Sequence, residues 1–132
     1  MSLFRVKYLS FFFIVISFFS FFNIIYSYYF NLYLNLNTYY FSLIISGVIG
    51  IIFYKIKTDI KKPTIFEKIS TVLLGYVLMP LILSIPFYLS IYNLSFLNSL
   101  FEAVSGFTST GFTVFENIKH IDQGLILWRS SI

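Results

Sequence analysis

The sequence predicts an all-α integral membrane protein, and three observations carry this prediction. Hydrophobic residues make up 58% of the 132 positions and charged residues only 11%, whereas a soluble domain carries roughly 25% charged residues. Several apolar runs are long enough to cross a bilayer. A segment rich in hydroxyl residues and glycines then interrupts the apolar pattern near the end of the chain. We therefore expect transmembrane helices together with a re-entrant pore helix and a filter loop.

The first apolar run, Tyr8–Phe30, predicts a transmembrane helix of roughly 34 Å. It is too long for the apolar region of a signal peptide, and no small-residue cleavage site follows it. We interpret it as a retained anchor. The asparagine-rich segment 31–38 predicts a loop, and Tyr39–Tyr54 predicts a second, shorter helix that needs Leu34 or Leu36 to extend it. Residues 1–54 are thus two leading transmembrane helices.

The segment KIKTDIKKP, residues 55–63, holds four lysines and one aspartate. Short loops rich in Lys and Arg remain cytoplasmic. Arg5 and Lys7 lie two crossings earlier and therefore on the same side. We expect residues 55–68 to be a cytoplasmic loop, the N-terminus to be cytoplasmic, and the protein to be a multi-pass protein of the cell (inner) membrane.

The third apolar run, Ile69–Tyr92, contains Pro80 and Pro86. Each proline lacks an N–H donor and clashes with the carbonyl four residues earlier, so we expect a kinked helix. The freed carbonyls of Tyr76 and Ile82 then need partners such as the Ser84 hydroxyl. This run opens the last unit, residues 69–132, which we expect to be a first helix–pore loop–helix repeat on the resemblance given below.

A short amphipathic helix is predicted over Leu97–Phe107, with Ser95 as its N-cap. Eleven residues span roughly 16 Å, about half a membrane. Its apolar face holds Leu97, Leu100, Phe101 and Val104, and its polar face holds Asn98, Glu102 and Ser105. The nine residues from Gly124 to Ile132 are too few to cross a membrane. Either they lie at the interface or they are the truncated start of a further helix in a longer protein, and we favour the second interpretation.

The segment that follows this helix predicts a cation-binding loop. Non-helical backbone at membrane depth is tolerated only inside protein or beside a wet cavity, and rings of backbone carbonyls replace the hydration shell of potassium in channels. Gly111 supplies a positive φ, and the hydroxyls of Thr108, Ser109 and Thr110 ligate the ion or brace the loop. A hydroxyl-rich turn that merely closes an interfacial helix is the alternative from spacing alone.

Two charged residues are candidates for supporting this loop. A carboxylate on a membrane-inserted helix is costly, which marks Glu102 as functional. We expect Glu102 to brace the loop, through Arg129 or a loop amide, rather than to bind the cation. For Arg129, extension to the outer interface is the simpler interpretation.

The composition also excludes several classes of function. The chain has no cysteine, so disulfide and thiolate chemistry are excluded, and His120 is the only histidine, which argues against zinc. Basic residues lie beside apolar segments rather than in one patch, so no nucleic-acid partner is expected despite the net charge of +4. We see no nucleophile–base pair or phosphate loop. The protein is therefore predicted not to be an enzyme and to need no cofactor; the lipid bilayer is its expected surrounding.

The run FEAVSGFTSTGFT, residues 101–113, resembles the first pore loop of the Trk/Ktr/HKT potassium-transporter superfamily, whose Trk-type subunits carry F-E-x-x-S-G-x-T-T-T-G-x-T there. The likeness continues in LILWRS, near the start of the next helix, and in the proline-bearing LSIPF. Two leading helices match the Trk branch. Ser109 stands where threonine is commoner, and Phe112 replaces an often smaller residue.

This resemblance implies potassium transport through one pore built from four repeats, of which the chain holds the first. Ser109, Thr110, Gly111 and Phe112 would bind potassium through their carbonyls, and Thr108, Thr113, Glu102 and Arg129 would support the filter. It also implies a homodimer with a cytoplasmic nucleotide-binding regulatory subunit. Because the backbone coordinates the ion, Ser109→Thr is expected to be nearly silent.

Two other functions stay open from the sequence. A different secondary transporter would use a discontinuous helix to bind its substrate at mid-membrane. A small membrane protein that only binds partners would conduct nothing. Further glycine-containing pore loops downstream would favour the potassium pore over both.

Overall fold

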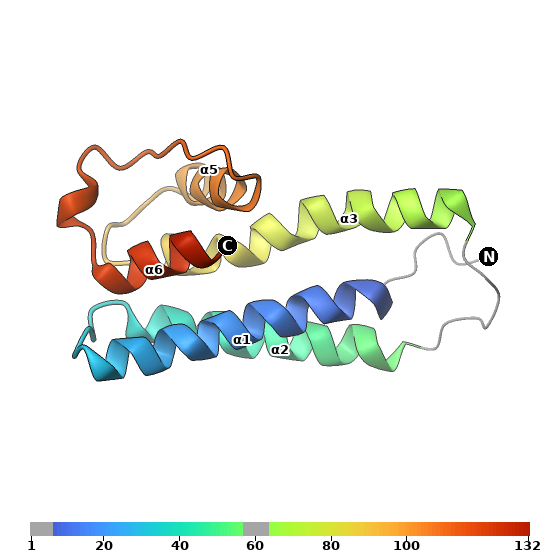
Figure 1. The fold of residues 1–132 in the computed structure, drawn as a ribbon, viewed down its shortest axis with the longest axis horizontal. Helices are drawn as coiled ribbons and strands as arrows, with labels where there is room; N and C mark the ends of the chain where they lie inside the picture. Colours follow the sequence, from blue (N-terminus) through green and yellow to red (C-terminus); the bar gives the residue numbers. More distant parts are fainter. Residues whose placement is uncertain (1–6, 57–63) are drawn as a thin grey trace.

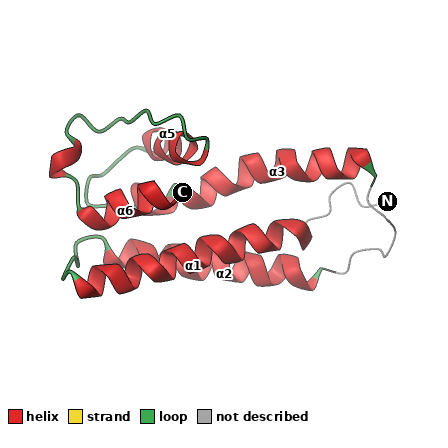
Figure 2. Cartoon of the chain, viewed as in Figure 1, coloured by secondary structure: helices red, strands yellow, loops and turns green. Residues whose placement is uncertain are grey.

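The computed structural model describes residues 7–56 and 64–132, so Arg5 and the lysines at 57, 61 and 62 lie outside the described residues. Within these ranges the chain consists of helices and loops, without a strand (Figure 2). Three of its helices are long and apolar enough to cross a membrane. The predicted all-α fold with membrane-spanning helices is confirmed to this extent. The helices are α1 (Lys7–Tyr29), α2 (Leu36–Lys55), α3 (Ile65–Leu83), α4 (Ile85–Tyr88), α5 (Phe96–Phe107), the 3₁₀ turn η1 (Ile118–His120) and α6 (Gln123–Ser131).

Helices α1 and α2 form an antiparallel hairpin with a seam of small and polar residues between them (Figure 1). Ser20 Oγ donates to Ser42 Oγ at 3.0 Å, and both side chains are fully buried. A β-carbon on Gly50 would lie 3.1 Å from Ile14, so glycine allows the two backbones to approach closely. Small residues and interhelical hydrogen bonds are what hold helices together in lipid, where apolar burial gives little driving force. The second helix begins at Leu36, one of the two residues considered for extending the short predicted helix Tyr39–Tyr54.

The kink predicted from the two prolines is a break between α3 and α4 at Ser84. Ser84 Oγ donates to the carbonyl of Leu81 at 2.8 Å, and the indole Nε1 of Trp128 donates to the carbonyl of Leu83 at 3.2 Å. Two carbonyls beside the break are thus satisfied by side chains, one of them from a distant element. The hydroxyl of Ser84 was expected to serve the carbonyls of Tyr76 and Ile82, and it donates to Leu81 instead; the indole of Trp128 was not anticipated.

The third helix begins at Ile65, inside the range 55–68 that was predicted as a loop. Its start is a capping box: Glu67 N donates to Thr64 Oγ1 at 3.3 Å, and Thr64 N donates to Glu67 Oε2 at 3.0 Å. The Thr-x-x-Glu signature is therefore what moves the boundary four residues earlier than the apolar pattern indicated.

Figure 1 shows the arrangement that positions the loop after α5. The loop between α1 and α2, the loop before α5 and the start of α6 all lie at one end of the bundle, and the start of α3 lies at the other. Helix α6 runs back along the bundle and reaches about its middle. Helix α5 is seen nearly end-on, so its axis crosses the long helices. A β-carbon on Gly106 would lie 2.9 Å from Ile132, which shows how closely α5 and α6 pack.

The core runs between the helices from Leu9 and Phe13 on α1 to Leu125 and Trp128 on α6. Its largest fully buried aromatic side chains are Phe13, Tyr39, Phe87 and Trp128. Most other large apolar side chains of α1, α2 and α3 point outward; Phe11, Phe18 and Phe22 are 67, 63 and 51% exposed. Such a surface is costly in water and favourable in lipid. Small and polar side chains between the helices, with large apolar side chains on the outer surface, are the arrangement expected of a membrane protein.

Candidate functional site

Helix α5 presents its polar face to the protein and its apolar face outward. Ser99, Glu102, Ala103 and Ser105 are buried, whereas Leu97 is 74% exposed and Phe101 47%. Of the predicted polar face, Glu102 and Ser105 are buried while Asn98 is exposed. Ser95 caps the helix, as predicted, by accepting from Asn98 N at 3.2 Å. Because polar groups need partners away from water while apolar ones do not, the inward polar face fits a lipid surrounding.

The carboxylate of Glu102 is the centre of a buried polar network (0% exposed). Its Oε1 accepts hydrogen bonds from Thr113 Oγ1 and from Val114 N, both at 2.6 Å. Its Oε2 lies 2.9 Å from Nε of Arg129. Glu102 thus contacts both groups considered as its structural partners, an arginine and a loop amide. Charged hydrogen bonds of this kind are short and strong, and the buried charge is compensated.

Arg129 carries the network from α6 to the loop. Its Nη2 donates to the carbonyl of Phe112 at 2.9 Å and lies 3.3 Å from the carbonyl of Gly111. The arginine therefore does not simply extend to the interface. One guanidinium joins the carboxylate of α5 to two successive carbonyls of the loop.

Ser105 ties the loop back to the end of α5. Its Oγ donates to the carbonyl of Phe112 at 2.6 Å, and its own carbonyl accepts from Thr110 N at 3.0 Å. Thr108 Oγ1 donates to the carbonyl of Val104 at 2.7 Å. The bond to the carbonyl of Ser105 uses one of the acceptors that a helix C-terminus leaves unpaired. Ser105 was predicted only as part of the polar face of this helix; its contacts with the loop were not predicted, although it lies within the run FEAVSGFTSTGFT.

The loop backbone has two residues with positive φ. Gly111 has φ 80°, as predicted, and Ser109 has φ 56°, which was not predicted. A non-glycine residue in this region is uncommon, and a β-branched one is strained there. The expectation that Ser109→Thr is nearly silent therefore changes: threonine keeps the hydroxyl but adds a branch at a left-handed position.

The four residues predicted as the filter are all at the surface of the described chain. Ser109 and Gly111, with Arg129, line an open hollow of about 290 Å³ between the loop and α6, whereas Thr110 and Phe112 are not part of its lining. Within the described residues, the carbonyl oxygens of Ser109 and Thr110 receive no hydrogen bond. This arrangement can offer free backbone oxygens to a ligand on one side while side chains hold the other side.

Among the residues that the structure describes, no three His, Cys, Asp or Glu side chains gather in one place. His120 lies exposed at the end of η1. The site therefore consists of backbone carbonyls, hydroxyls and one ion pair, a donor set that suits hard cations through oxygen.

The fold and the site together define an α-helical membrane protein with a braced, carbonyl-bearing loop. Known proteins with similar sequences are transporters. The chain is 29% identical to an uncharacterized cation transporter of Methanocaldococcus jannaschii over 103 residues, which are 76% of this chain and 22% of that protein. It is 39% identical to the Trk system potassium uptake protein TrkI of Halomonas elongata over 56 residues, or 42% of this chain and 11% of that protein.

These relatives are much longer than the chain, which spans about a fifth of the first and about a tenth of the second. No known protein family matches the sequence, and no solved structure matches it. The similarity thus supports a relationship to cation transporters, a Trk-type protein among them.

Proposed function

We propose that the chain is the first part of a Trk-type potassium transporter and that α5 with residues 108–113 is its first pore loop. The carrying observation is the Glu102–Arg129 ion pair, whose guanidinium holds the carbonyls of Phe112 and Gly111. A loop that only closed a surface helix would not need a buried carboxylate, because burying a charge is costly unless it is well compensated. The names of the two transporter relatives point the same way.

Potassium would be bound by the carbonyls of Ser109, Thr110, Gly111 and Phe112. The oxygens of Ser109 and Thr110 are without a hydrogen-bond partner among the described residues. The carbonyl oxygen of Gly111 accepts from Arg129 alone, so one of its two lone pairs remains for the ion. That of Phe112 accepts from both Arg129 and Ser105, and it would have to give up one of these bonds to bind the ion. Thr108, Thr113, Glu102 and Arg129 would then support the filter rather than touch the ion.

One loop supplies one side of the pore, so the remaining repeats of a longer chain would supply the others.

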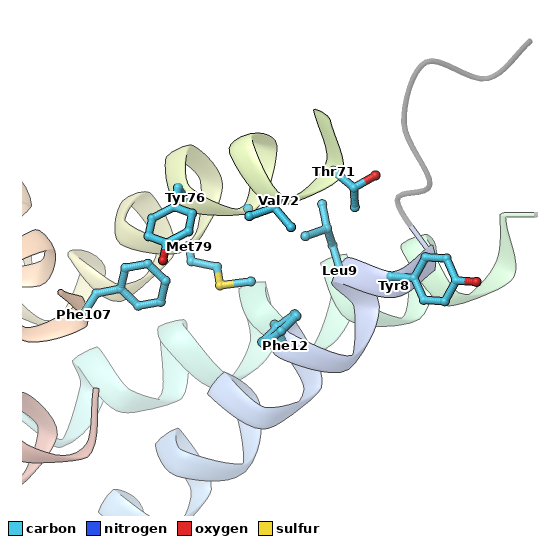
Figure 3. A pocket seen from close by; sticks show the side chains of 9 residues that line it. Tyr8, Leu9, Phe12, Thr71, Val72, Tyr76, Met79 and Phe107 are labelled. Atoms are coloured by element: carbon cyan, nitrogen blue, oxygen red, sulfur yellow. The ribbon is translucent and has the colours of Figure 1, made fainter. Parts of the chain in front are cut away.

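We propose that α6 continues along an apolar groove between α1 and α3 (Figure 3). The groove has a volume of about 240 Å³ and is lined by Leu9, Phe12, Gly75 and Met79 among others. A smaller neighbouring cavity of about 120 Å³ shares Phe12 and Met79 with it and is lined by Ile132, the last residue of the chain. The C-terminal end of α6 therefore lies next to this groove.

The proposal includes an orientation and an assembly. The protein would be a multi-pass protein of the cell membrane with a cytoplasmic N-terminus and the loop on the outer side. The protein would form a homodimer and bind a cytoplasmic nucleotide-binding regulatory subunit. It would need no cofactor and would bind no nucleic acid. The lysines at the 55–68 end support the orientation.

Uptake by the complete transporter that contains this chain tests the proposal. The complete protein should restore growth of a potassium-uptake-deficient strain at low potassium, and Glu102→Gln should abolish the rescue at matched membrane abundance. Glu116→Gln, an exposed carboxylate beyond the loop, is the matched control and should leave growth intact. Rescue that survives Glu102→Gln and Arg129→Gln alike would show that the loop is not the filter, and uptake of an organic substrate instead would favour a discontinuous-helix transporter.

A further inference from the structure

Three oxygen atoms from three helices meet at the N-terminal end of α6. A β-carbon on Gly124 would lie 2.9 Å from Tyr39 Oη, 3.0 Å from Asp122 Oδ2 and 3.4 Å from Ser27 Oγ. These residues belong to α2, to the N-cap of α6 and to α1. Glycine at 124 is therefore what leaves room for the three oxygens to converge.

Two of these oxygens are buried without a partner. Tyr39 and Ser27 are both 0% exposed, and within the described residues neither hydroxyl makes a hydrogen bond. Asn23 lies one turn before Ser27 on α1; it is 0% exposed, and its Oδ1 is likewise unpaired. Buried polar groups nearly always have a partner, in protein or in ordered water. Two unpaired hydroxyls at the meeting point of α1, α2 and α6, with the unpaired amide oxygen of Asn23 one helical turn away, indicate that a polar ligand belongs there.

Asp122 is held in place by neutral donors. Asn35 Nδ2 donates to Asp122 Oδ2 at 3.2 Å, while Ile91 N donates to Asn35 Oδ1 at 3.1 Å. Asp122 N donates to Tyr92 Oη at 2.6 Å. Asp122 is 8% exposed, and its carboxylate stands at the positive end of the α6 dipole. The carboxylate is thus oriented toward the two hydroxyls and can accept further hydrogen bonds.

We propose that this junction is a hydration site, occupied by ordered water that bridges Tyr39, Ser27 and Asp122. Water matches the groups that converge there: it accepts from the hydroxyls of Tyr39 and Ser27 and donates to the carboxylate of Asp122. A buried water typically makes about three such bonds. A metal cation matches them less well, because both hydroxyl hydrogens would turn away from it and the helix N-terminus would repel it.

The site fastens the start of α6 to the leading hairpin. Arg129 lies five positions after Gly124 on the same helix and contacts the loop carbonyls, and Trp128 contacts the break at Leu83. The hairpin α1–α2 would therefore set the position of α6 and, through it, of the loop. The hydration site itself stands on the geometry and does not depend on the proposed transport function.

Hydroxyl-radical labelling by X-ray radiolysis of the purified chain in detergent tests the site, because a bound water next to a ring becomes a radical that modifies it. Tyr39 should be labelled although it is fully buried. Phe13, which is 1% exposed in a packed part of α1, is the dry control and should remain unlabelled. Labelling of Tyr39 no higher than that of Phe13 would overturn the proposal.

Two variants connect the signal to this water. Gly124→Ala should reduce Tyr39 labelling several-fold, because its methyl group occupies the space between the oxygens. If Gly124→Ala loses its helical content, Ser27→Ala decides instead, since it removes a partner of the water without adding an atom, and it should reduce the labelling too. Ser46→Ala, whose hydroxyl is buried but bonded to Ser42 O, is the control and should change nothing. Undiminished Tyr39 labelling in the deciding variant would contradict the proposal.

Discussion

Arg129 and Glu102 form an ion pair with 2.9 Å between Nε and Oε2, and the carboxylate is completely buried. The pair joins α6 to α5, and its two members contact the loop on opposite sides: Glu102 through Thr113 and Val114, Arg129 through Gly111 and Phe112. The loop after α5 is consequently held by both helices. The stability of the site and the geometry of its carbonyls should therefore depend on the same two side chains.

Glu102→Gln should destabilise the chain by about 3 kcal/mol, because breaking a buried pair leaves Arg129 without its counter-charge. Unfolding by denaturing detergent, followed by circular dichroism, measures this loss. The double variant Glu102→Gln, Arg129→Gln should be more stable than the sum of the two single losses predicts, since neither charge remains. Strict additivity of the two changes would show that the pair contributes nothing.

Ser109→Gly should stabilise the chain, and Ser109→Thr should destabilise it, each by roughly 1 kcal/mol. The reason is the φ of 56° at Ser109, which glycine adopts freely and a β-branched residue avoids. The same unfolding measurement checks the order Gly, Ser, Thr. Thr110, three positions after the end of α5 and without positive φ, is the control: Thr110→Gly should not stabilise. A more stable Ser109→Thr would contradict the recorded backbone conformation.

The helices were predictable because apolar runs of 16 to 24 residues leave few alternatives in a membrane protein. Helix α2 begins at Leu36, inside the predicted loop 31–38 and three residues before the predicted start at Tyr39, whereas the break near the prolines followed from their chemistry. The start of α3 at Ile65 was not predicted, because the apolar pattern gave way there to a Thr64–Glu67 capping box. Local hydrogen-bond chemistry decided that boundary.

The candidate site was predictable in its residues and in the partners of Glu102, an arginine and a loop amide, but not in its other contacts. The motif placed Glu102, Arg129 and Gly111 together, and the need for a positive φ at Gly111 followed from the loop chemistry. The contacts of Trp128 with Leu83 and of Asn35 with Asp122 join residues 45 and 87 positions apart. No local pattern reports such pairs, because they depend on how α6 packs against the other helices.

The two ends of the bundle should face opposite sides of the membrane. Lys55 ends α2, Asn117 precedes η1, and both side chains are exposed. Because the chain has no cysteine, Lys55→Cys and Asn117→Cys can be labelled singly with an impermeant thiol reagent. In intact cells Asn117→Cys should react and Lys55→Cys should not; permeabilised cells should label both. The reverse pattern would invert the proposed orientation.

Gly111 should be the least replaceable residue of the loop in the complete transporter. Its φ is 80°, and a β-carbon there would meet no atom within 4 Å in this chain. The cost of substitution therefore comes from the backbone angle, on the order of 1–2 kcal/mol. Gly111→Ser should weaken discrimination of potassium from sodium more than it lowers protein abundance, because a relaxed φ turns a carbonyl away from the ion. Uptake of both ions at matched membrane expression measures it.

Asparagine separates this explanation from simple crowding in the assembled pore. Asn tolerates the left-handed region better than other side chains do, so Gly111→Asn should retain more potassium selectivity than Gly111→Ala, although its side chain is larger. If crowding by the neighbouring repeats were the cause, the smaller alanine would be tolerated better and the order would reverse. Equal selectivity in Gly111→Asn, Gly111→Ala and the unchanged protein would remove Gly111, and with it the carbonyl filter, from the account of this loop.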